Sequence, residues 1–216
     1  MTVSLPRVVV LISGRGSNLA AILGADLPLQ VVAVISNRPG APGLELATGR
    51  GIPVALLSAD EYPDRDDYDD RLRALIDLHE PNLVVLAGFM RILSPSLVRH
   101  YARRMLNIHP SLLPAFTGLH THRRALDGAV AVHGCTVHFV TEELDGGPIV
   151  AQGVVPVLPS DDEAQLAQRV LAMEHRLFPM VLRAWAEGRL TWEGERPLLR
   201  RADGTPGERW LGLDPS

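Results

Sequence analysis

The chain has 216 residues, of which 46% are apolar and 21% charged, a composition typical of a folded globular protein and not of a disordered one. All 21 basic residues are arginine, which excludes Schiff-base chemistry, pyridoxal-phosphate catalysis and the P-loop, since each needs a lysine. The single cysteine excludes an internal disulfide and any multi-cysteine metal site. Because the net charge is −4 and no apolar run approaches the roughly 20 residues of a membrane span, we expect a cytoplasmic protein that binds neither nucleic acid nor membranes.

Short runs rich in Val, Ile and Leu recur along the first half of the chain without alternating polar residues. Such runs are typical of strands that are buried on both faces of a parallel sheet. The predicted strands are residues 8–12, 31–35, 54–57, 83–87 and 105–108. The segments between them predict helices over residues 17–23, 44–49, 66–79 and 94–101. This alternation favours an α/β fold built from strand–helix–strand units.

The pattern changes in the second half of the chain, where two extended runs with a short connection predict an antiparallel edge. These two predicted strands are residues 136–141 and 148–157. Ser160 and Glu163 have the spacing of a capping box and predict the start of a long helix, which Pro179 kinks or splits. We therefore expect one domain over residues 1–190 and a C-terminal extension over residues 191–216, for which the sequence indicates no role.

The first predicted strand ends in a glycine-rich turn, Ser-Gly-Arg-Gly-Ser-Asn over residues 13–18. Such a turn points backbone N–H groups at an anion from the start of a helix. A dinucleotide site would need a further glycine where Leu19 stands, and an acidic residue where residues 36–38 read Ser-Asn-Arg. The turn therefore favours a single phosphate over NAD, and a turn that merely requires glycine is the alternative.

A second motif, Asn-Ile-His-Pro, lies at the carboxyl end of the fifth predicted strand, where open α/β sheets bind ligands. Asn107 and His109 are two residues apart on an extended segment, so their side chains project to the same face. An amide and an imidazole can together stabilise an oxyanion. Metal ligation and a purely structural role are the alternatives for the histidine.

Asp145 lies in a tight Asp-Gly-Gly-Pro turn, where a carboxylate could orient an imidazole and relay a proton. The alternative is a turn aspartate that caps its own backbone. The histidines at 120, 122, 133 and 138 lack the spacing of a known zinc motif, so we expect no metal. Cys135 opens an apolar strand and is expected to be buried and inert.

Together and in this order, the motifs resemble those of the phosphoribosylglycinamide formyltransferase family, folate-dependent enzymes of purine synthesis. The resemblance spans residues 7–190 and is carried by residues 9–18, 86–95, 106–114 and 138–148. It implies a Rossmann-like formyltransferase fold with a mostly parallel twisted sheet and an antiparallel C-terminal edge. It also implies formyl transfer from the co-substrate 10-formyltetrahydrofolate to the amine of glycinamide ribonucleotide, by a monomer or weak homodimer.

The resemblance assigns a role to each matching residue. The implied catalytic residues are Asn107, His109 and Asp145. The implied nucleotide-binding residues are Gly16, Ser17, Asn18 and Glu174. The implied folate-binding residues are Arg65, Met90, Arg91, Ile92, Leu93, Asn107 and Thr141.

Two positions depart from the family pattern: Ala115 stands where some members have lysine, and Thr117 where proline is usual. Because of these two departures, the family pattern does not determine the conformation of the loop after His109. The main alternative function is formyltetrahydrofolate hydrolysis by the same three catalytic residues. Hydrolases of this type usually carry an N-terminal regulatory domain, whereas here the first strand begins near Arg7. Methionyl-tRNA formyltransfer would need a basic RNA-binding surface, and a sensor of folate or nucleotide would not need the catalytic residues.

Overall fold

The computed structural model describes residues 4–62 and 64–212. They fall into two compact units. The first contains the chain up to Asn107 together with Val140–Glu142, and the second contains Ile108–Phe139 and the chain from Glu143 onward.

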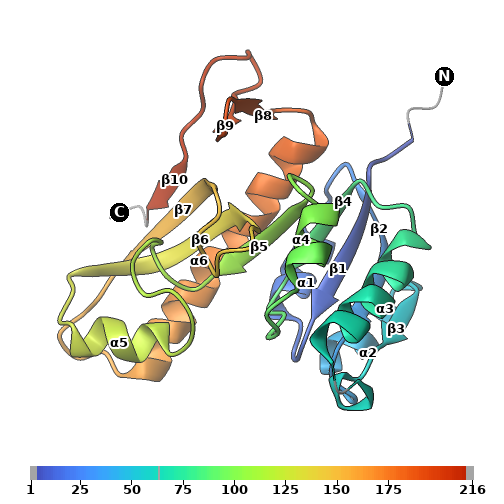
Figure 1. The fold of residues 1–216 in the computed structure, drawn as a ribbon. Coiled ribbons are helices and arrows are strands. Elements are labelled where there is room, and N and C mark those ends of the chain that lie inside the picture. Colours follow the sequence, from blue (N-terminus) through green and yellow to red (C-terminus); the bar gives the residue numbers. More distant parts are fainter. Residues whose placement is uncertain (1–3, 63, 213–216) are drawn as a thin grey trace. The chain divides into compact units, whose positions relative to one another are not determined.

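The first unit holds the parallel part of the fold (Figure 1). Its strands are β1 (Arg7–Ile12), β2 (Gln30–Ser36), β3 (Val54–Leu56), β4 (Leu83–Leu86) and β5 (Met105–His109), whose last two residues belong to the second unit. They run parallel in the order β3-β2-β1-β4-β5. All five predicted strands are confirmed, because unbroken Val, Ile and Leu runs need cover on both faces of the sheet.

Helices connect these strands, as predicted. They are α1 (Ser17–Gly24), α2 (Pro42–Thr48), α3 (Arg65–Asp77) and α4 (Pro95–His100), with a short 3₁₀ turn, η1, at Ala59–Glu61. α1 and α2 contact each other, and so do α3 and α4. Since the chain moves outward in one direction from β1 and in the other toward β5, right-handed crossovers place the two pairs on opposite faces. The face under α3 and α4 is a continuous apolar core that includes Val9, Leu11, Tyr68 and Leu72.

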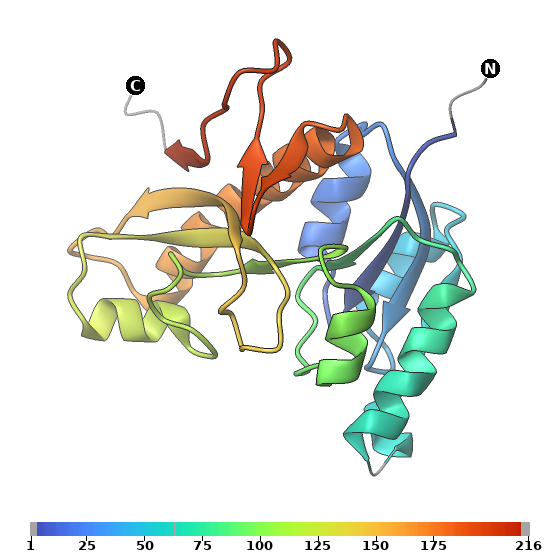
Figure 2. The same cartoon turned by 45° about the horizontal axis from the view of Figure 1, so that its top comes forward.

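The second unit contains the antiparallel part of the fold. In it β6 (Val132–Phe139) pairs antiparallel with β7 (Ile149–Pro156), and β10 (Trp210–Gly212) adds to β7 in parallel. Its helices are α5 (Thr121–Asp127) and α6 (Glu163–Ala186), and α6 packs along β6 and β7 (Figure 2). A separate hairpin joins β8 (Leu190–Glu193) to β9 (Arg196–Leu199). The predicted antiparallel edge is confirmed.

The start of α6 was placed wrongly by the sequence pattern. Its N-cap is Asp162, not Ser160, and Gln165 completes the capping box in place of Glu163. Asp161 explains the shift, because its carboxylate accepts the Leu158 N–H and pairs with a guanidinium on α6, which closes the preceding turn. The helix also continues past Pro179 without the predicted split.

The C-terminal extension has structure that the sequence pattern did not predict. Trp192 on β8 packs on Phe139 at the end of β6, with 4.6 Å between ring centroids. Arg209 donates hydrogen bonds to the carbonyls of Ile149 and Val150, so the segment around β10 covers an edge of β7 that would otherwise be open.

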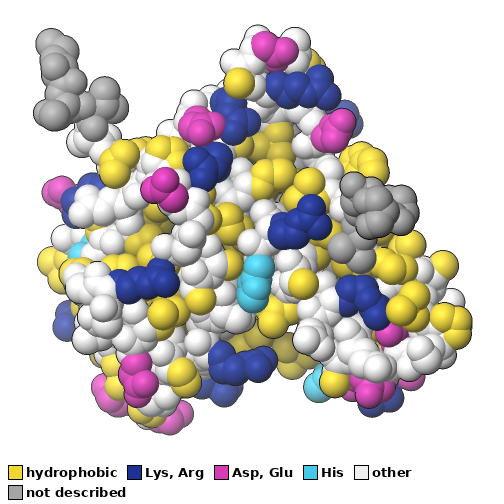
Figure 3. All heavy atoms as spheres, turned by 180° about the vertical axis from the view of Figure 1, so that it is seen from behind, with side chains coloured by type: hydrophobic (Ala, Val, Ile, Leu, Met, Phe, Trp, Pro, Cys, Tyr) yellow, Lys and Arg dark blue, Asp and Glu magenta, His cyan; other side chains and the backbone are white. Residues whose placement is uncertain are grey.

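On the face shown in Figure 3, acidic and basic side chains are interspersed among apolar ones. In the described part of the chain, every helix is too short or too polar to cross a membrane.

Candidate active site

The glycine-rich turn after β1 is built around Gly16, the N-cap of α1. Gly16 has φ 74°, and a Cβ there would lie 2.8 Å from the Cα of Gly43 at the start of α2. The Gly43 N–H donates to the Gly14 carbonyl at 3.1 Å, which holds the two helix starts together. Because a glycine cap has no side chain, the N-terminal N–H groups of α1 are not covered by the cap residue itself. The geometry therefore suits a phosphate at Gly16, Ser17 and Asn18.

Ser13 ties this turn to the segment that follows β4. Its buried hydroxyl donates to Asn37 Oδ1 at 2.6 Å and accepts the Met90 N–H at 2.7 Å, and its own N–H donates to the Gly88 carbonyl at 3.1 Å. Asn37 lies in the Ser-Asn-Arg stretch that argued against NAD. Sequence reasoning used that stretch only to exclude a ligand and missed its role in support of the turn.

In the predicted folate segment, residues 90–93, Met90 and Ile92 present apolar side chains to their surroundings, whereas Leu93 is buried in the apolar core of the first unit. Met90 and Ile92 are 62% and 56% exposed. The Arg91 guanidinium lies 4.1 Å from the centre of the Tyr68 ring on α3. Buried Asp69 accepts the Ser94 N–H and so fixes the end of the segment. Such exposed apolar side chains on a fixed backbone suit a planar aromatic ligand.

The remaining predicted folate residues lie elsewhere in the first unit. Arg65 is the first residue of α3, and its charge, like that of Arg91, acts on Asp69. Burial nevertheless raises the pKa of Asp69, against the lowering effects of the Ser94 hydrogen bonds and the two arginines. Thr141 follows Val140, whose N–H donates to the Met105 carbonyl on β5 at 2.9 Å.

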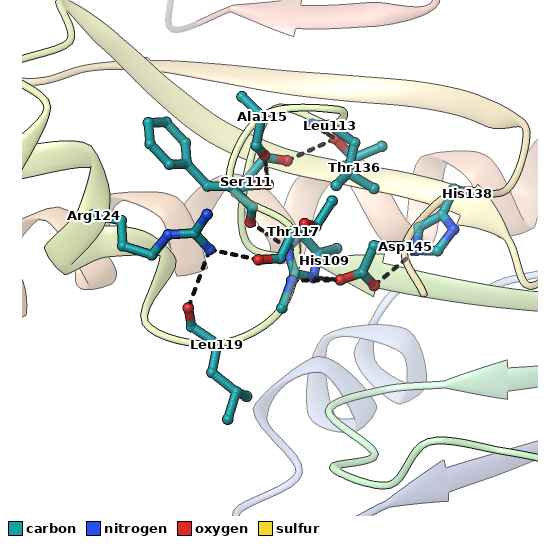
Figure 4. Close-up of polar contacts among 12 residues, drawn as sticks. His109, Ser111, Leu113, Ala115, Thr117, Leu119, Arg124, Thr136, His138 and Asp145 are labelled. Atoms are coloured by element: carbon teal, nitrogen blue, oxygen red, sulfur yellow. Dashed lines mark hydrogen bonds and ion pairs between the residues drawn. The ribbon is translucent and has the colours of Figure 1, made fainter. Parts of the chain in front are cut away.

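His109 ends β5 with both ring nitrogens facing acceptors (Figure 4). Nε2 lies 3.0 Å from the Phe116 carbonyl oxygen, and Nδ1 lies 3.4 Å from Asp145 Oδ2. A carbonyl and a carboxylate both accept hydrogen bonds, so each ring nitrogen of His109 faces an acceptor. Asn107 precedes His109 by two residues on the same strand and therefore projects to the same side.

Asp145 is nearly buried and adopts φ 54°, a conformation that aspartate tolerates better than most residues. Its Oδ2 also accepts the Gly118 N–H at 2.8 Å. His138 Nε2 lies 3.9 Å from Oδ1, but burial lowers the pKa of His138 and its Nδ1 faces the Phe139 carbonyl at 3.1 Å. His109 is therefore the nearer of the two imidazoles beside the Asp145 carboxylate, and His138 is the one whose protonation burial disfavours.

Two polar side chains on β6 and β7 fix the segment that follows His109. Thr136 donates to the Ser111 carbonyl at 2.7 Å and accepts the Leu113 N–H at 3.0 Å. Gln152 donates to the Leu113 carbonyl at 2.8 Å. Sequence reasoning missed both, although a threonine and a glutamine inside otherwise apolar strands were the available signal.

Glu174 lies on α6 and is buried. Burial and, secondarily, the Glu174 charge raise the pKa of the Cys135 thiol. The predicted burial of Cys135 is confirmed.

His133 is a second buried histidine close to His109. Both of its ring nitrogens lack a hydrogen-bond partner within the described residues, and its ring meets those of Phe116 and His122 edge to face. Burial, followed by the charges of His122 and His109, lowers the pKa of His133 to about 4. Within residues 4–62 and 64–212, no group of three or more His, Cys, Asp and Glu side chains is placed to hold a metal ion.

This histidine predicts an acid-sensitive fold. Below pH 6.5 the His133 imidazole binds a proton in the unfolded chain, whereas in the folded protein it stays neutral down to about pH 4. The free energy of unfolding therefore decreases as the pH falls from 6.5 towards 4. We expect a loss of about 3 kcal/mol across this range, since one pKa unit corresponds to about 1.4 kcal/mol. Urea unfolding at several pH values should show a shallower acid limb for His133→Asn, while exposed His120→Asn serves as the control. Parallel curves for the His133 variant and the parent would contradict this.

The chain is similar in sequence to known formyl transferases. The formyl transferase family model matches residues 6–182. Phosphoribosylglycinamide formyltransferase of Escherichia coli (strain K12) is 52% identical over 188 residues, which cover 85% of this chain and 89% of that protein.

Solved structures give the same picture. The phosphoribosylglycinamide formyltransferase of Coxiella burnetii matches with a TM-score of 0.89 at 44% identity, over 98% of this chain and 100% of that one. A formyltetrahydrofolate deformylase of Pseudomonas syringae pv. tomato str. DC3000 matches with a TM-score of 0.85 at 32% identity, over 91% of this chain and 66% of that one. The predicted formyltransferase fold is thus confirmed, and the chain belongs to the phosphoribosylglycinamide formyltransferase family of formyl transferases.

Proposed function

We propose that the protein transfers the formyl group of 10-formyltetrahydrofolate to the amine of glycinamide ribonucleotide, in purine biosynthesis. The observation that carries the proposal is the His109–Asp145 pair, with Nδ1 3.4 Å from Oδ2; His109 lies on the strand that also bears Asn107. The 52% identity to the Escherichia coli enzyme supports the same reaction.

The first step is attack of the substrate amine on the formyl carbon. The new C–N bond leaves a negative charge on the formyl oxygen and a positive charge on the attacking nitrogen. The Asn107 amide and the His109 imidazolium stabilise the oxyanion. The Phe116 carbonyl holds Nε2 and Nδ1 lies beside Asp145, so we assign Nδ1 as the nitrogen that serves the reaction.

The second step moves protons. The Asp145 carboxylate takes the proton from the cationic amine, directly or through a water molecule. The oxyanion then re-forms the carbonyl and the bond to the folate nitrogen breaks. That nitrogen receives a proton from His109 or from the same water, which leaves formylated ribonucleotide and tetrahydrofolate.

We assign the remaining site residues by the chemistry that each can provide. The turn at Gly16, Ser17 and Asn18 holds the substrate phosphate, and Glu174 contacts the ribose. The folate site uses the exposed apolar side chains of Met90 and Ile92 in the segment of residues 90–93, with further contacts from Arg65 and Thr141. The steps described above use 10-formyltetrahydrofolate as the formyl donor and do not involve a metal ion.

A folate absorbance assay tests the proposal. Purified protein is mixed with 10-formyltetrahydrofolate, with and without glycinamide ribonucleotide. Deformylation that depends on the ribonucleotide supports the transferase. Deformylation without it would identify a hydrolase. The similarity to the Pseudomonas syringae deformylase is the reason to test this alternative. Binding of both ligands without turnover would contradict both and indicate a sensor.

Gly16→Ala tests the phosphate assignment. The added Cβ would lie 2.8 Å from the Gly43 Cα, and φ 74° is strained for alanine. We expect the KM for glycinamide ribonucleotide to rise at least about tenfold and the unfolding free energy to fall by about 1–3 kcal/mol. Gly24→Ala on α1 is the control, since nothing lies within 4 Å of its added Cβ. An unchanged KM would refute the assignment.

We infer that residues 1–190 form the formyltransferase domain, in line with the family match to residues 6–182. The edge contacts of Arg209 support a covering role for residues 191–216. A cytoplasmic location fits a chain with one buried cysteine. A monomer or weak homodimer is expected, which sedimentation velocity would check.

A further inference from the structure

We infer that Arg124 is a positioning residue, which acts on the reaction by holding the loop from Phe116 to Leu119 against His109 and Asp145. The inference rests on the proposed function for its effect on turnover. Its structural part concerns contacts within the second unit and can be tested separately.

The loop contacts both members of the catalytic pair through its backbone. The Phe116 carbonyl faces His109 Nε2 at 3.0 Å, and the Gly118 N–H donates to Asp145 Oδ2 at 2.8 Å. The orientation of the imidazole and that of the carboxylate therefore both depend on the path of this loop. A small displacement of the Phe116 carbonyl would free the ring to rotate away from Asp145.

The path of the loop is unusual and needs support. Phe116 and His120 adopt φ 56° and φ 57°, which L-residues other than asparagine and aspartate rarely do, and Gly118 between them adopts φ 76°. A backbone in this conformation persists only where surrounding contacts hold it.

Arg124 supplies such contacts from α5. Its Nη1 donates to the Thr117 carbonyl at 2.5 Å and lies 3.5 Å from the Leu119 carbonyl, and its guanidinium carbon is 5.6 Å from the centre of the Phe116 ring (Figure 4). One side chain thus contacts three of the four residues of the loop. Hydrogen bonds from a charged donor are stronger than neutral ones.

The two departures from the family pattern, Ala115 and Thr117, leave these contacts available. The Ala115 carbonyl accepts the Ser111 hydroxyl at 2.6 Å, and the Thr117 carbonyl accepts from Arg124. Both positions are held by main-chain oxygens, which are present whatever the side chain. The loop therefore does not need lysine at 115 or proline at 117 for its conformation.

The neighbouring Arg123 is a matched control. It lies on the same helix and is also exposed, but it pairs with Glu163 at 3.0 Å. Arg123→Ala removes the same charge and the same length of side chain as Arg124→Ala. Arg123, however, pairs with Glu163, and the loop contacts described above belong to Arg124. Differences between the two variants therefore report the loop contacts and not the loss of a positive charge.

The first test measures turnover. We expect Arg124→Ala to lower kcat about tenfold, with both KM values changed less than about twofold, and Arg123→Ala to leave kcat unchanged. Millimolar methylguanidinium should restore part of the kcat of Arg124→Ala and have no effect on Arg123→Ala. Equal kcat in the two variants, or a loss confined to KM, would overturn the inference. Wild-type protein without ribonucleotide-dependent turnover would instead overturn the proposed function.

The second test needs no activity. A histidine-selective ¹⁵N–¹H spectrum of the wild type should show a slowly exchanging Nε2–H for His109, because it donates to the Phe116 carbonyl. The signal should be lost in Arg124→Ala and kept in Arg123→Ala, and its retention in both would overturn the inference. If circular dichroism shows that Arg124→Ala does not fold, Arg124→Gln, which keeps a shorter neutral donor, takes its place in both tests with the same expected order.

Discussion

Asp145→Asn is expected to lower kcat at least about 10²-fold, because an amide can neither balance the His109 imidazolium nor take the proton from the attacking amine. The shape of the side chain is kept, and the amide oxygen can still accept the Gly118 N–H. We therefore expect the loop to stay in place and the dissociation constants of both substrates to change little. Single-turnover kinetics together with calorimetric binding of each substrate would separate the two effects.

The control for this variant is Asp127→Asn, which removes an exposed carboxylate at the end of α5. It makes the same chemical change at an exposed position and should leave turnover unaltered. Near-wild-type kcat in Asp145→Asn would remove Asp145 from the mechanism. Weak substrate binding with normal kcat would instead make it a residue that shapes the loop.

The sequence predicts the sheet well because its signal is local. Runs such as Val8–Leu11 and Leu83–Leu86 are apolar on both faces, and only a strand covered on both sides accommodates them. Helix α5 was missed because it buries only Thr121 and Ala125 and lacks the start signals of the comparably short α2 and α4, since its N-cap, His120, makes no side-chain cap hydrogen bond and no proline opens it. The start of α6 was misplaced because two overlapping capping patterns fit the sequence, and the Arg169–Asp161 side-chain pair, which no capping motif includes, decides between them.

In the candidate site, too, the features with a local sequence signal were predicted, and those that depend on contacts between distant residues were not. The spacing of Asn107 and His109 indicates that the two side chains share a face and can stabilise an oxyanion, whereas the grouping with Asp145 is what the family resemblance implies. Which imidazole nitrogen faces the carboxylate depends on the Phe116 carbonyl, and thus on a loop with positive φ values that no motif encodes. The role of Arg124 was not predicted for the same reason, since its partners are main-chain oxygens.

The last prediction separates the charge of His109 from its contact with the loop. His109→Ala removes both the imidazolium and the hydrogen bond to Phe116, so a loss of about 10²–10³ in kcat could come from either. His109→Gln can still donate to the Phe116 carbonyl but carries no positive charge. We expect it to be nearly as slow as His109→Ala, because oxyanion stabilisation needs the charge, whereas the loop contact alone accounts for the roughly tenfold effect expected at Arg124.

His100→Ala is the matched control, because His100 forms a similar imidazole–carboxylate pair with Asp77, at 3.2 Å, in an exposed position. It should leave kcat unchanged, which would show that loss of such a pair does not by itself slow the reaction. Pre-steady-state deformylation rates for the three variants provide the comparison. A His109→Gln variant within about tenfold of wild type would mean that the imidazole serves mainly to anchor the loop, and that Asn107 and the backbone stabilise the oxyanion without a cation.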